Sequence, residues 1–118
     1  MRNIIFYSYP KCSTCKKASK WLDQNNANYQ LIDIVKRPPS KNLLELALMQ
    51  FSSDKRKIFN TRGKSFKLID SDINDLSNEK IIELLSNDGK LIKRPFLVIN
   101  DITFILGFNE SEYSTYLK

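Results

Sequence analysis

The sequence predicts an α/β fold, and two observations lead to this prediction. Residues 4–35 read as strand, helix and strand, and residues 96–106 read as two short apolar runs separated by Asn100-Asp101. Patterns typical of helices fill most of the segment between them, residues 40–90. A chain of 118 residues, of which 42% are hydrophobic, can bury one core. No apolar run approaches the roughly 20 residues that span a bilayer, so we expect one soluble domain.

The first strand, the first helix and the second strand follow one another without a linker. Residues 4–9 (IIFYSY) are apolar and β-favouring, and residues 29–35 form a second such run. Between them, residues 13 to about 26 carry apolar side chains at helical spacing: Ala18, Trp21 and Leu22. Because a helix joins the two strands, we expect them to be parallel.

The next segment is predicted to be mainly helical. Ser40 follows two prolines and can cap a helix, and a short basic helix is expected around residues 54–60. A less regular stretch comes after it. Ser77 can cap a further helix that ends near residue 87, and we expect Gly89 to stop that helix in the left-handed conformation.

The C-terminal part is predicted to be a β-hairpin followed by a helix. Asn100-Asp101 separates the runs 96–99 and 102–106, and both residues tolerate positive φ, so a two-residue turn is expected. Asn109 can then cap the last helix.

These elements come in the order of a thioredoxin-like fold. The order is a βαβ unit, a helical insertion at about residues 40–90, a β-hairpin and a C-terminal helix. We expect the whole chain, residues 1–118, to form one such domain.

The two cysteines, Cys12 and Cys15, restrict the chemistry because the chain contains no histidine. Structural zinc needs four Cys or His ligands, so one chain cannot complete a site without carboxylates. Nucleophile–base pairs that use histidine are excluded for the same reason. A disulfide that closes so short a loop adds little stability. The sequence therefore predicts a redox pair, with two unrelated thiols or a zinc ion shared between chains as the alternatives.

The position of the two cysteines supports a redox role. Cys12 follows the first strand and Cys15 lies in the first turn of the helix, where free backbone N–H groups and the helix dipole stabilise a thiolate. Lys11, Lys16 and Lys17 add positive potential. We expect Cys12 to be the nucleophile and Cys15, further into the helix, to be the resolving thiol.

Arg94-Pro95, just before the predicted third strand, is the second element of the candidate site. Thioredoxin-like folds have a cis-proline at this place, and proline makes the cis bond inexpensive. We expect Pro95 to be cis beside the cysteines and to carry Arg94 towards Cys12 as a permanent cation. The alternative is a trans proline with an exposed arginine. Tyr9 is expected at the edge of the core rather than as a platform for a ligand.

The net charge of +6 is unevenly distributed, since the excess of Lys and Arg lies in residues 1–59. A basic half suits an acidic partner or an anionic substrate, and a merely solvated surface is the alternative. No nucleic-acid-binding motif accompanies the charge, so direct nucleic-acid binding is not expected. Arg62 is either a second cation at the cysteine site or a solvated turn residue, and the sequence leaves both open.

Several motifs along the chain are familiar as a set: YPKCSTCKKA, RPPS, FNTRGKSFK, LIKRP and GFNE. Together they resemble the arsenate reductase/Spx family, in order and over nearly the whole chain. The resemblance implies a thioredoxin-like core with a helical insertion.

Two functions are known in that family. Its arsenate reductases attack arsenate with a cysteine at the position of Cys12 and bind it with three arginines; Arg94 matches one of these, and Asn60 stands at the place of another. Its Spx-type regulators have CxxC and a TR-x-K-x-F element, matched here from Thr61 to Phe66. They bind the C-terminal domain of the RNA polymerase α subunit.

We therefore expect a cytoplasmic thiol–disulfide redox protein of this family, with an Spx-type redox-sensing regulator and an arsenate reductase as alternatives. Whether it is an enzyme stays open. No metal or cofactor is expected beyond a thiol reductant such as glutathione/glutaredoxin or thioredoxin. The expected partner is a protein disulfide or a small thiol, or RNA polymerase α, and a monomer away from membranes is the default. The catalytic residues would be Cys12, Cys15 and Arg94, and the substrate-binding residues Lys11, Arg62 and Pro95.

Overall fold

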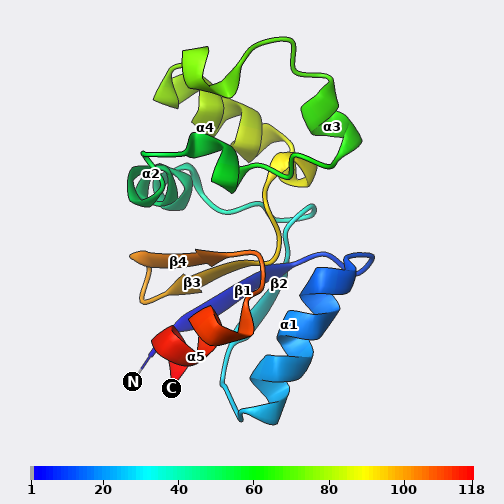
Figure 1. Cartoon of the computed structure of the whole chain (residues 1–118), viewed down its shortest axis with the longest axis vertical. Coiled ribbons are helices and arrows are strands. Elements are labelled where there is room, and N and C mark those ends of the chain that lie inside the picture. The colour runs from blue at the N-terminus through cyan, green and yellow to red at the C-terminus, as the bar shows by residue number, and fades with distance from the viewer. Residues whose placement is uncertain (1) are drawn as a thin grey trace.

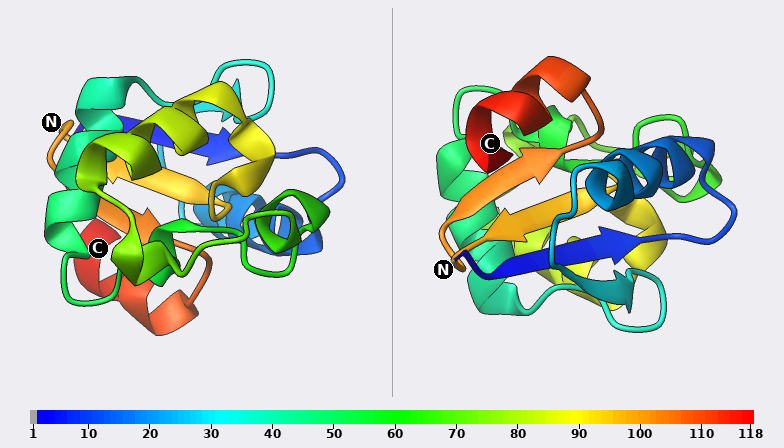
Figure 2. Two further views of the ribbon diagram at one scale, coloured as in Figure 1. Left: turned by 90° about the horizontal axis from the view of Figure 1, so that it is seen from above. Right: turned by 90° about the horizontal axis from the view of Figure 1, so that it is seen from below.

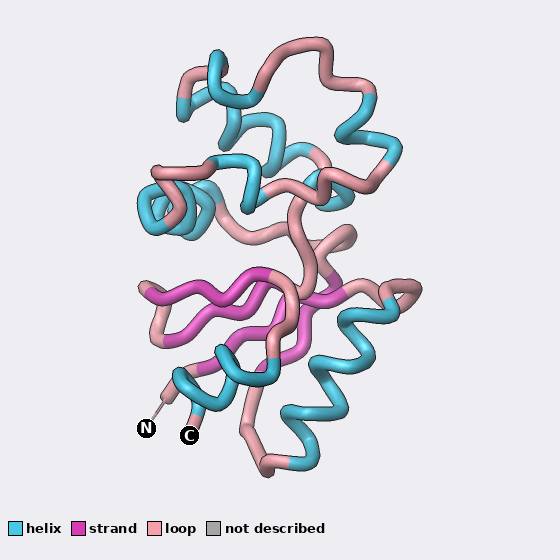
Figure 3. Tube along the Cα trace, viewed as in Figure 1, coloured by secondary structure: helices cyan, strands magenta, loops and turns pink. Residues whose placement is uncertain are grey.

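The computed structural model describes residues 2–118 and contains one four-stranded sheet (Figures 1 and 3). The strands are β1 (Ile4–Ser8), β2 (Gln30–Asp33), β3 (Phe96–Ile99) and β4 (Thr103–Leu106). Their spatial order is β2-β1-β3-β4. β1 and β2 are parallel, as predicted, whereas the β1–β3 and β3–β4 pairs are antiparallel. The predicted thioredoxin-like α/β fold is confirmed.

Helices cover both faces of the sheet. The helices α1 (Ser13–Gln24) and α5 (Glu110–Leu117) lie on one face, and the helical segment between β2 and β3 lies on the other (Figures 1 and 2). Each face buries its own apolar cluster. The cluster under α1 and α5 contains Ala18, Trp21, Leu22, Leu97 and Tyr113, together with residues of β1 and β4.

The segment between β2 and β3 consists of six short helices. They are α2 (Lys41–Gln50), η1 (Lys55–Ile58), α3 (Lys64–Lys67), η2 (Ile73–Asp75), α4 (Asn78–Asn87) and η3 (Gly89–Leu91). The predicted caps of the two longer helices are confirmed, because the Ser40 and Ser77 hydroxyls accept the N–H groups of Leu43 and Lys80. The basic helix expected at 54–60 is the 3₁₀ turn η1.

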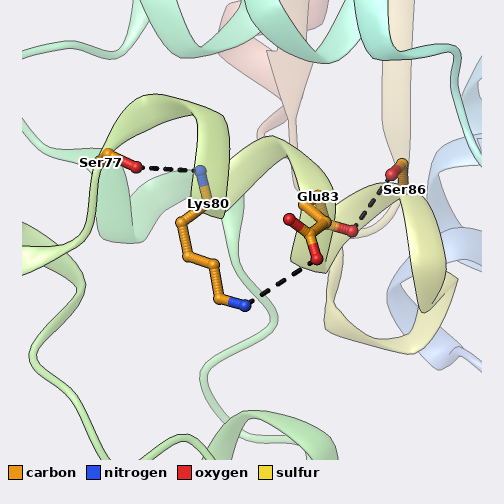
Figure 4. A network of polar contacts seen from close by, with 4 residues as sticks. All are labelled: Ser77, Lys80, Glu83 and Ser86. Carbon is orange, nitrogen blue, oxygen red and sulfur yellow. Dashed lines mark hydrogen bonds and ion pairs between the residues drawn. The ribbon is translucent and has the colours of Figure 1, made fainter.

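Polar side chains line the exposed face of α4 (Figure 4). Ser77 caps the helix at 3.1 Å from the Lys80 N–H, and the Lys80 ammonium lies 3.9 Å from the Glu83 carboxylate. The Ser86 hydroxyl donates to the Glu83 carbonyl at 3.1 Å. The opposite face carries the buried Ile81 and Leu85. This division explains why α4 lies flat on the apolar cluster with its charges in solvent.

The expected role of Gly89 was wrong. Among the described glycines, only Gly107 has positive φ, so Gly89 does not end α4 in the left-handed conformation. Instead Asp88 caps the next turn, η3, and Gly89 is buried against the backbone of Ile34. A Cβ atom at Gly89 would collide with the Ile34 carbonyl oxygen, so glycine is needed for close approach rather than for its φ.

The hairpin turn forms where it was predicted. Asn100 and Asp101 have φ of 52° and 63°, and the Ile102 N–H donates to the Ile99 carbonyl, which is the pattern of a type I′ turn. β4 begins at Thr103, one residue later than expected. Asn109 caps α5 through the Glu112 N–H, as predicted.

Gln50, the last residue of α2, ties the helical segment to the outer edge of the sheet. Its amide nitrogen donates to the Phe104 carbonyl at 2.7 Å, and its amide oxygen accepts the Phe104 N–H at 2.9 Å. Both free backbone groups of an edge-strand residue are thus paired by one side chain.

No helix within residues 2–118 has the length and apolar character needed to cross a membrane.

Candidate thiol redox site

The site begins where β1 turns into α1. The Cys12 N–H closes a tight turn by donating to the Tyr9 carbonyl at 3.0 Å. Cys12 is then the N-cap of α1, and its sulfur accepts the Cys15 N–H at 3.3 Å. A cap position places the sulfur at the positive end of the helix, against N–H groups that have no partner within the helix. The Cys12 sulfur thus lies at the start of α1 and is held there by a backbone hydrogen bond.

Cys15 lies in a different environment, although it is only one helical turn away. Its side chain is 1% exposed, whereas Cys12 is partly exposed. Burial raises the pKa of the Cys15 thiol to about 12, and the hydrogen bond and charge of Cys12 add to the rise; the Tyr9 backbone and the Ser8 side chain act in the opposite direction. Both cysteines are free thiols. The pair therefore combines one accessible sulfur with one that holds its proton.

Pro95 and Arg94 lie close to this turn. The Arg94–Pro95 peptide bond is cis, as the sequence predicted, and Pro95 is buried. The Arg94 guanidinium carbon lies 4.8 Å from the centre of the Tyr9 ring, and its Nη1 donates to the Lys90 carbonyl at 3.3 Å. Arg94 thus contacts Tyr9, at the start of the turn that ends at Cys12, and the Lys90 carbonyl.

A cationic cleft of about 260 Å³ opens beside this arginine. Arg94, Lys64 and Lys90 supply its positive charge, and Tyr9, Asn60, Gly63 and Ser65 complete its lining. The cleft forms because Asn60 donates its N–H to the Leu91 carbonyl at 2.7 Å and Phe59 pairs with Ile92, which brings the turn before α3 next to the segment before Pro95. Such a cleft suits an anionic group.

Sequence reasoning missed most of this cleft. Tyr9 was assigned to the edge of the core, which it does contact, but its outer face also supports Arg94. Lys64 and Lys90 gave no local signal, because long-range contacts such as the Phe59–Ile92 pairing and the Asn60–Leu91 hydrogen bond bring their segments together. The one indication of the cleft in the sequence was Tyr9, which lies three residues before Cys12 on the same turn.

The remaining predicted residues are at the surface. Lys11 is exposed next to Cys12, and Lys16 and Lys17 are exposed on the first turn of α1. Arg62 is also exposed and is not part of the cleft lining. Within residues 2–118, no three His, Cys, Asp or Glu side chains come together as a metal-binding group.

Comparison with known proteins places this site in a family. The model of the ArsC family matches residues 7–116. The chain belongs to the ArsC family. The match includes both cysteines, the cleft residues and Arg94-Pro95.

Individual relatives cover nearly the same length. The uncharacterized protein YusI of Bacillus subtilis strain 168 is 36% identical over 113 residues, covering 94% of this chain and 95% of YusI. The global transcriptional regulator Spx of Lactiplantibacillus plantarum is 30% identical over 97% of this chain and 86% of its own. A crystal structure from Streptococcus mutans UA159, described as a possible arsenate reductase, is 34% identical with a TM-score of 0.87, covering 97% and 99% of the two chains.

The similarities and the geometry of the site indicate the same general class of protein. Membership of the ArsC family, together with two close cysteines at the start of a helix, supports a thiol redox protein. The relatives include both a regulator and an arsenate reductase-like structure, so they do not separate those two roles.

Proposed function

We propose that this ArsC family protein performs thiol–disulfide exchange, with Cys12 as the nucleophile and Cys15 as the resolving thiol. The observation that carries the proposal is the contrast within one helical turn. The Cys12 sulfur is accessible and accepts the Cys15 N–H, while Cys15 is buried with a raised pKa. Cys12 is therefore suited to attack a disulfide, and Cys15 to stay protonated until the mixed disulfide has formed.

The exchange proceeds in two balanced steps. The Cys12 thiolate attacks one sulfur of a partner disulfide, forms a mixed disulfide and releases the other partner sulfur as a thiolate, which takes up a proton. Cys15 then loses its proton and attacks the Cys12 sulfur, which forms the Cys12–Cys15 disulfide and releases the second partner thiol. Two electrons have passed to the partner. A thiol reductant such as glutathione/glutaredoxin or thioredoxin restores the two thiols.

We assign the cationic cleft to the anionic part of the partner. Arg94 is held in the cleft by the Tyr9 ring and the Lys90 carbonyl. Tyr9 begins the turn that ends at Cys12, so a carboxylate held by Arg94 would keep the rest of its disulfide close to the sulfur. Pro95 supports the segment that carries Arg94, and Lys11 adds positive charge beside Cys12. Arg62 has no role in this proposal, because it lies outside the cleft lining.

Thiol trapping with three proteins tests the proposal. Glutathione disulfide is added to the wild type, Cys12→Ser and Cys15→Ser, and the products are measured by intact mass after alkylation. We expect an internal disulfide in the wild type, a stable mixed disulfide in Cys15→Ser and no adduct in Cys12→Ser. Unchanged reactivity of Cys12→Ser would overturn the assignment. A redox titration of the wild type should place the pair between roughly −180 and −300 mV, within the range of cellular thiol couples.

A redox-sensing regulator is the second candidate, and one comparison favours it. The L. plantarum relative named Spx aligns with 97% of this chain. Such a role would use the same disulfide as a switch for binding the C-terminal domain of the RNA polymerase α subunit. Pull-down of that purified domain by the reduced and the oxidised protein tests it. Retention in only one redox state supports the regulator, and retention in neither state removes it.

Arsenate reduction is the third candidate, favoured by the three cations of the cleft and by the S. mutans structure. It requires arsenite production in the presence of glutathione/glutaredoxin or thioredoxin. The Cys15→Ser protein separates arsenate reduction from thiol exchange. If an external thiol performs the reduction, attack on the oxyanion needs only Cys12, so this variant should still produce arsenite.

A further inference from the structure

The two outer edges of the sheet differ. The strand order makes β2 and β4 the outer strands (Figure 2). On β4, the Gln50 amide pairs both free backbone groups of Phe104. β2 carries no such cover, and within residues 2–118 its only strand partner is β1. Because an open edge can pair with another extended chain, proteins usually cover it or give it charged side chains. The open edge of β2 therefore calls for an explanation.

The register shows which backbone groups of β2 are free. The Ile34 N–H donates to the Ser8 carbonyl at 2.8 Å, so every second residue back along β2 also directs its backbone groups towards β1. Leu31 and Asp33 are the alternate residues, and they direct theirs away from the sheet. The Asp33 carbonyl accepts the Arg37 N–H at 2.9 Å. The Leu31 N–H, the Leu31 carbonyl and the Asp33 N–H have no partner within residues 2–118.

An apolar hollow lies at the same edge. It has a volume of about 370 Å³ and is lined by Ser8, Pro10, Leu31, Ile32 and Asp33. The Leu31 side chain is 63% exposed. Side chains alternate along a strand, and Ile32 is buried under the helical segment, so Leu31 lies on the face of α1. An extended segment that pairs with the Leu31 backbone can therefore also place an apolar side chain in the hollow.

The hollow lies next to the turn that carries the nucleophile. Asp33, at the end of β2, is opposite Ser8 in the register. Tyr9 lines the cationic cleft, whereas its neighbours Ser8 and Pro10 line the hollow. The turn that begins at Tyr9 ends at Cys12. A segment docked on β2 thus runs towards this turn and holds its own cysteine near Cys12.

The charge at this edge restricts what can occupy it. Lys11 follows Pro10, and Lys36 and Arg37 follow β2; all three are exposed, and none forms an ion pair in the described part of the chain. The Asp33 carboxylate already accepts two backbone N–H groups of the turn after β2. A second copy of this chain would bring the same cations together, with a net charge of +6 on each chain. An acidic segment matches the edge better.

We propose that the outer edge of β2 is a docking site for an acidic, extended segment of the protein disulfide that Cys12 attacks. The segment adds a strand beside β2, pairs with the free backbone groups of Leu31 and Asp33, and places an apolar side chain in the hollow. The proposal rests on the assignment of Cys12 as the nucleophile. It makes a polypeptide disulfide, rather than a small one, the preferred substrate.

The rate of attack on a peptide disulfide tests the docking. The probe is the peptide Glu-Val-Glu-Val-Glu-Gly-Cys, whose cysteine forms a mixed disulfide with thionitrobenzoate. The Cys12 thiolate attacks the peptide sulfur, forms a Cys12–peptide disulfide and releases the coloured thionitrobenzoate anion, which stopped-flow absorbance measures. The mixed disulfide of mercaptoethanol with thionitrobenzoate has the same leaving group and no segment to dock. Two further peptides carry N-methyl groups on one or the other alternate set of their backbone nitrogens.

Two variants change the edge. Leu31→Ser removes the apolar side chain, and Leu31→Pro also removes an outward N–H, which proline tolerates at a strand edge. Leu68→Ser is the matched control, because Leu68 is 81% exposed and lies in the helical segment. Thermal unfolding of each protein is measured in parallel. The methylated peptides test the pairing on the unchanged protein, so the result does not depend on how the variants fold.

We expect Leu31→Ser to react with the peptide about five- to tenfold more slowly than the wild type, and Leu31→Pro more slowly still. Leu68→Ser should match the wild type, and all four proteins should react equally with the mercaptoethanol disulfide. Methylation of one alternate set should slow the wild-type reaction, and methylation of the other should not, because only one edge of the peptide faces β2.

Equal rates with the unmethylated and both methylated peptides would overturn this inference. A wild-type dimer that Leu31→Ser converts to a monomer in sedimentation would also overturn it, because a second copy would then occupy the edge. Both results leave the proposed function intact as long as the mercaptoethanol disulfide reacts. If the wild type releases no thionitrobenzoate from any of these disulfides, Cys12 is not the nucleophile and both proposals fail.

Discussion

Cys12 and Cys15 differ mainly in how much each is shielded from water. A helix of this kind offers free N–H groups only at its first turn, so the sulfur at the cap receives a hydrogen bond without being buried. The thiol one turn later points into the core beside Ala18. The same three-residue spacing thus produces one sulfur ready for attack and one held in its neutral form.

The raised pKa of Cys15 predicts the pH dependence of resolution. Because this pKa, about 12, lies above the ordinary value, the thiol is almost fully protonated near neutral pH. The thiolate fraction, and with it the rate of resolution, should rise about tenfold per pH unit between pH 6 and 9. The concentration-independent release from the mixed disulfide measures this rate. A plateau below pH 9 would show that Cys15 loses its proton more easily than its burial implies.

Arg94 should discriminate between partners by their charge. Arg94→Gln removes a partly exposed cation from the cleft, so the rate of attack on the anionic glutathione disulfide should fall about two- to fivefold. The rate with uncharged hydroxyethyl disulfide should not change. Stopped-flow measurement of Cys12 modification with both disulfides tests this.

Arg62→Gln is the matched control for that experiment, because Arg62 is exposed and lies outside the cleft. An equal loss of rate in both variants would mean that general surface charge, rather than the cleft, attracts the anion.

At the scale of the element, helix caps account for where the helices of this chain begin. Cys12, Ser40, Ser77 and Asn109 each accept a backbone N–H three residues later. The caps Ser40, Ser77 and Asn109 are structural, whereas Cys12 is also the candidate nucleophile. The same capping hydrogen bond therefore serves both folding and chemistry.

Ser77→Ala should lower the free energy of unfolding by about 1 kcal/mol, since the Lys80 N–H loses its acceptor. Urea denaturation measures the difference. Ser86→Ala, on the same helix, is the control: its hydroxyl only donates back to the Glu83 carbonyl, so its removal should change stability little. Equal effects of the two substitutions would show that the cap is not formed in solution.

At the scale of the whole molecule, the helical segment between β2 and β3 supplies most of the cleft, and it must therefore be held firmly on the sheet. Its apolar cluster provides most of that attachment. Gln50 adds a directional contact, because its amide pairs both backbone groups of Phe104 at the edge of β4.

Gln50→Ala should lower the free energy of unfolding by about 1 kcal/mol, because two hydrogen bonds to a partly buried edge are replaced by water. Hydrogen exchange at the Phe104 amide should increase at the same time. Gln24→Ala, at the exposed end of α1, is the control and should change neither quantity. Unchanged protection of Phe104 in Gln50→Ala would contradict this contact.

The fold could be predicted well from the sequence, because its signals are local. The apolar stripe of α1, the serine caps and the Asn100-Asp101 turn each depend on residues within a few positions of one another, and all three are confirmed. Gly89 shows where this reasoning fails. A glycine after a helix suggests a left-handed stop, but the real constraint on Gly89 is the distant backbone of Ile34.

The candidate site also has some features that local sequence predicts and others that depend on tertiary contacts. The sequence by itself placed Cys12 after the first strand, Cys15 in the first turn of the helix and Pro95 before β3, because strand, turn and helix preferences are set by neighbouring residues. The cis form of Pro95 was expected from the thioredoxin-like order of the elements, and that Cys12 caps the helix is seen only in the structure. Only the tertiary structure decided that Arg94 rests on Tyr9 and that Lys64 and Lys90 share its cleft. These contacts join segments far apart in the chain, and they exist only after apolar burial has brought those segments together.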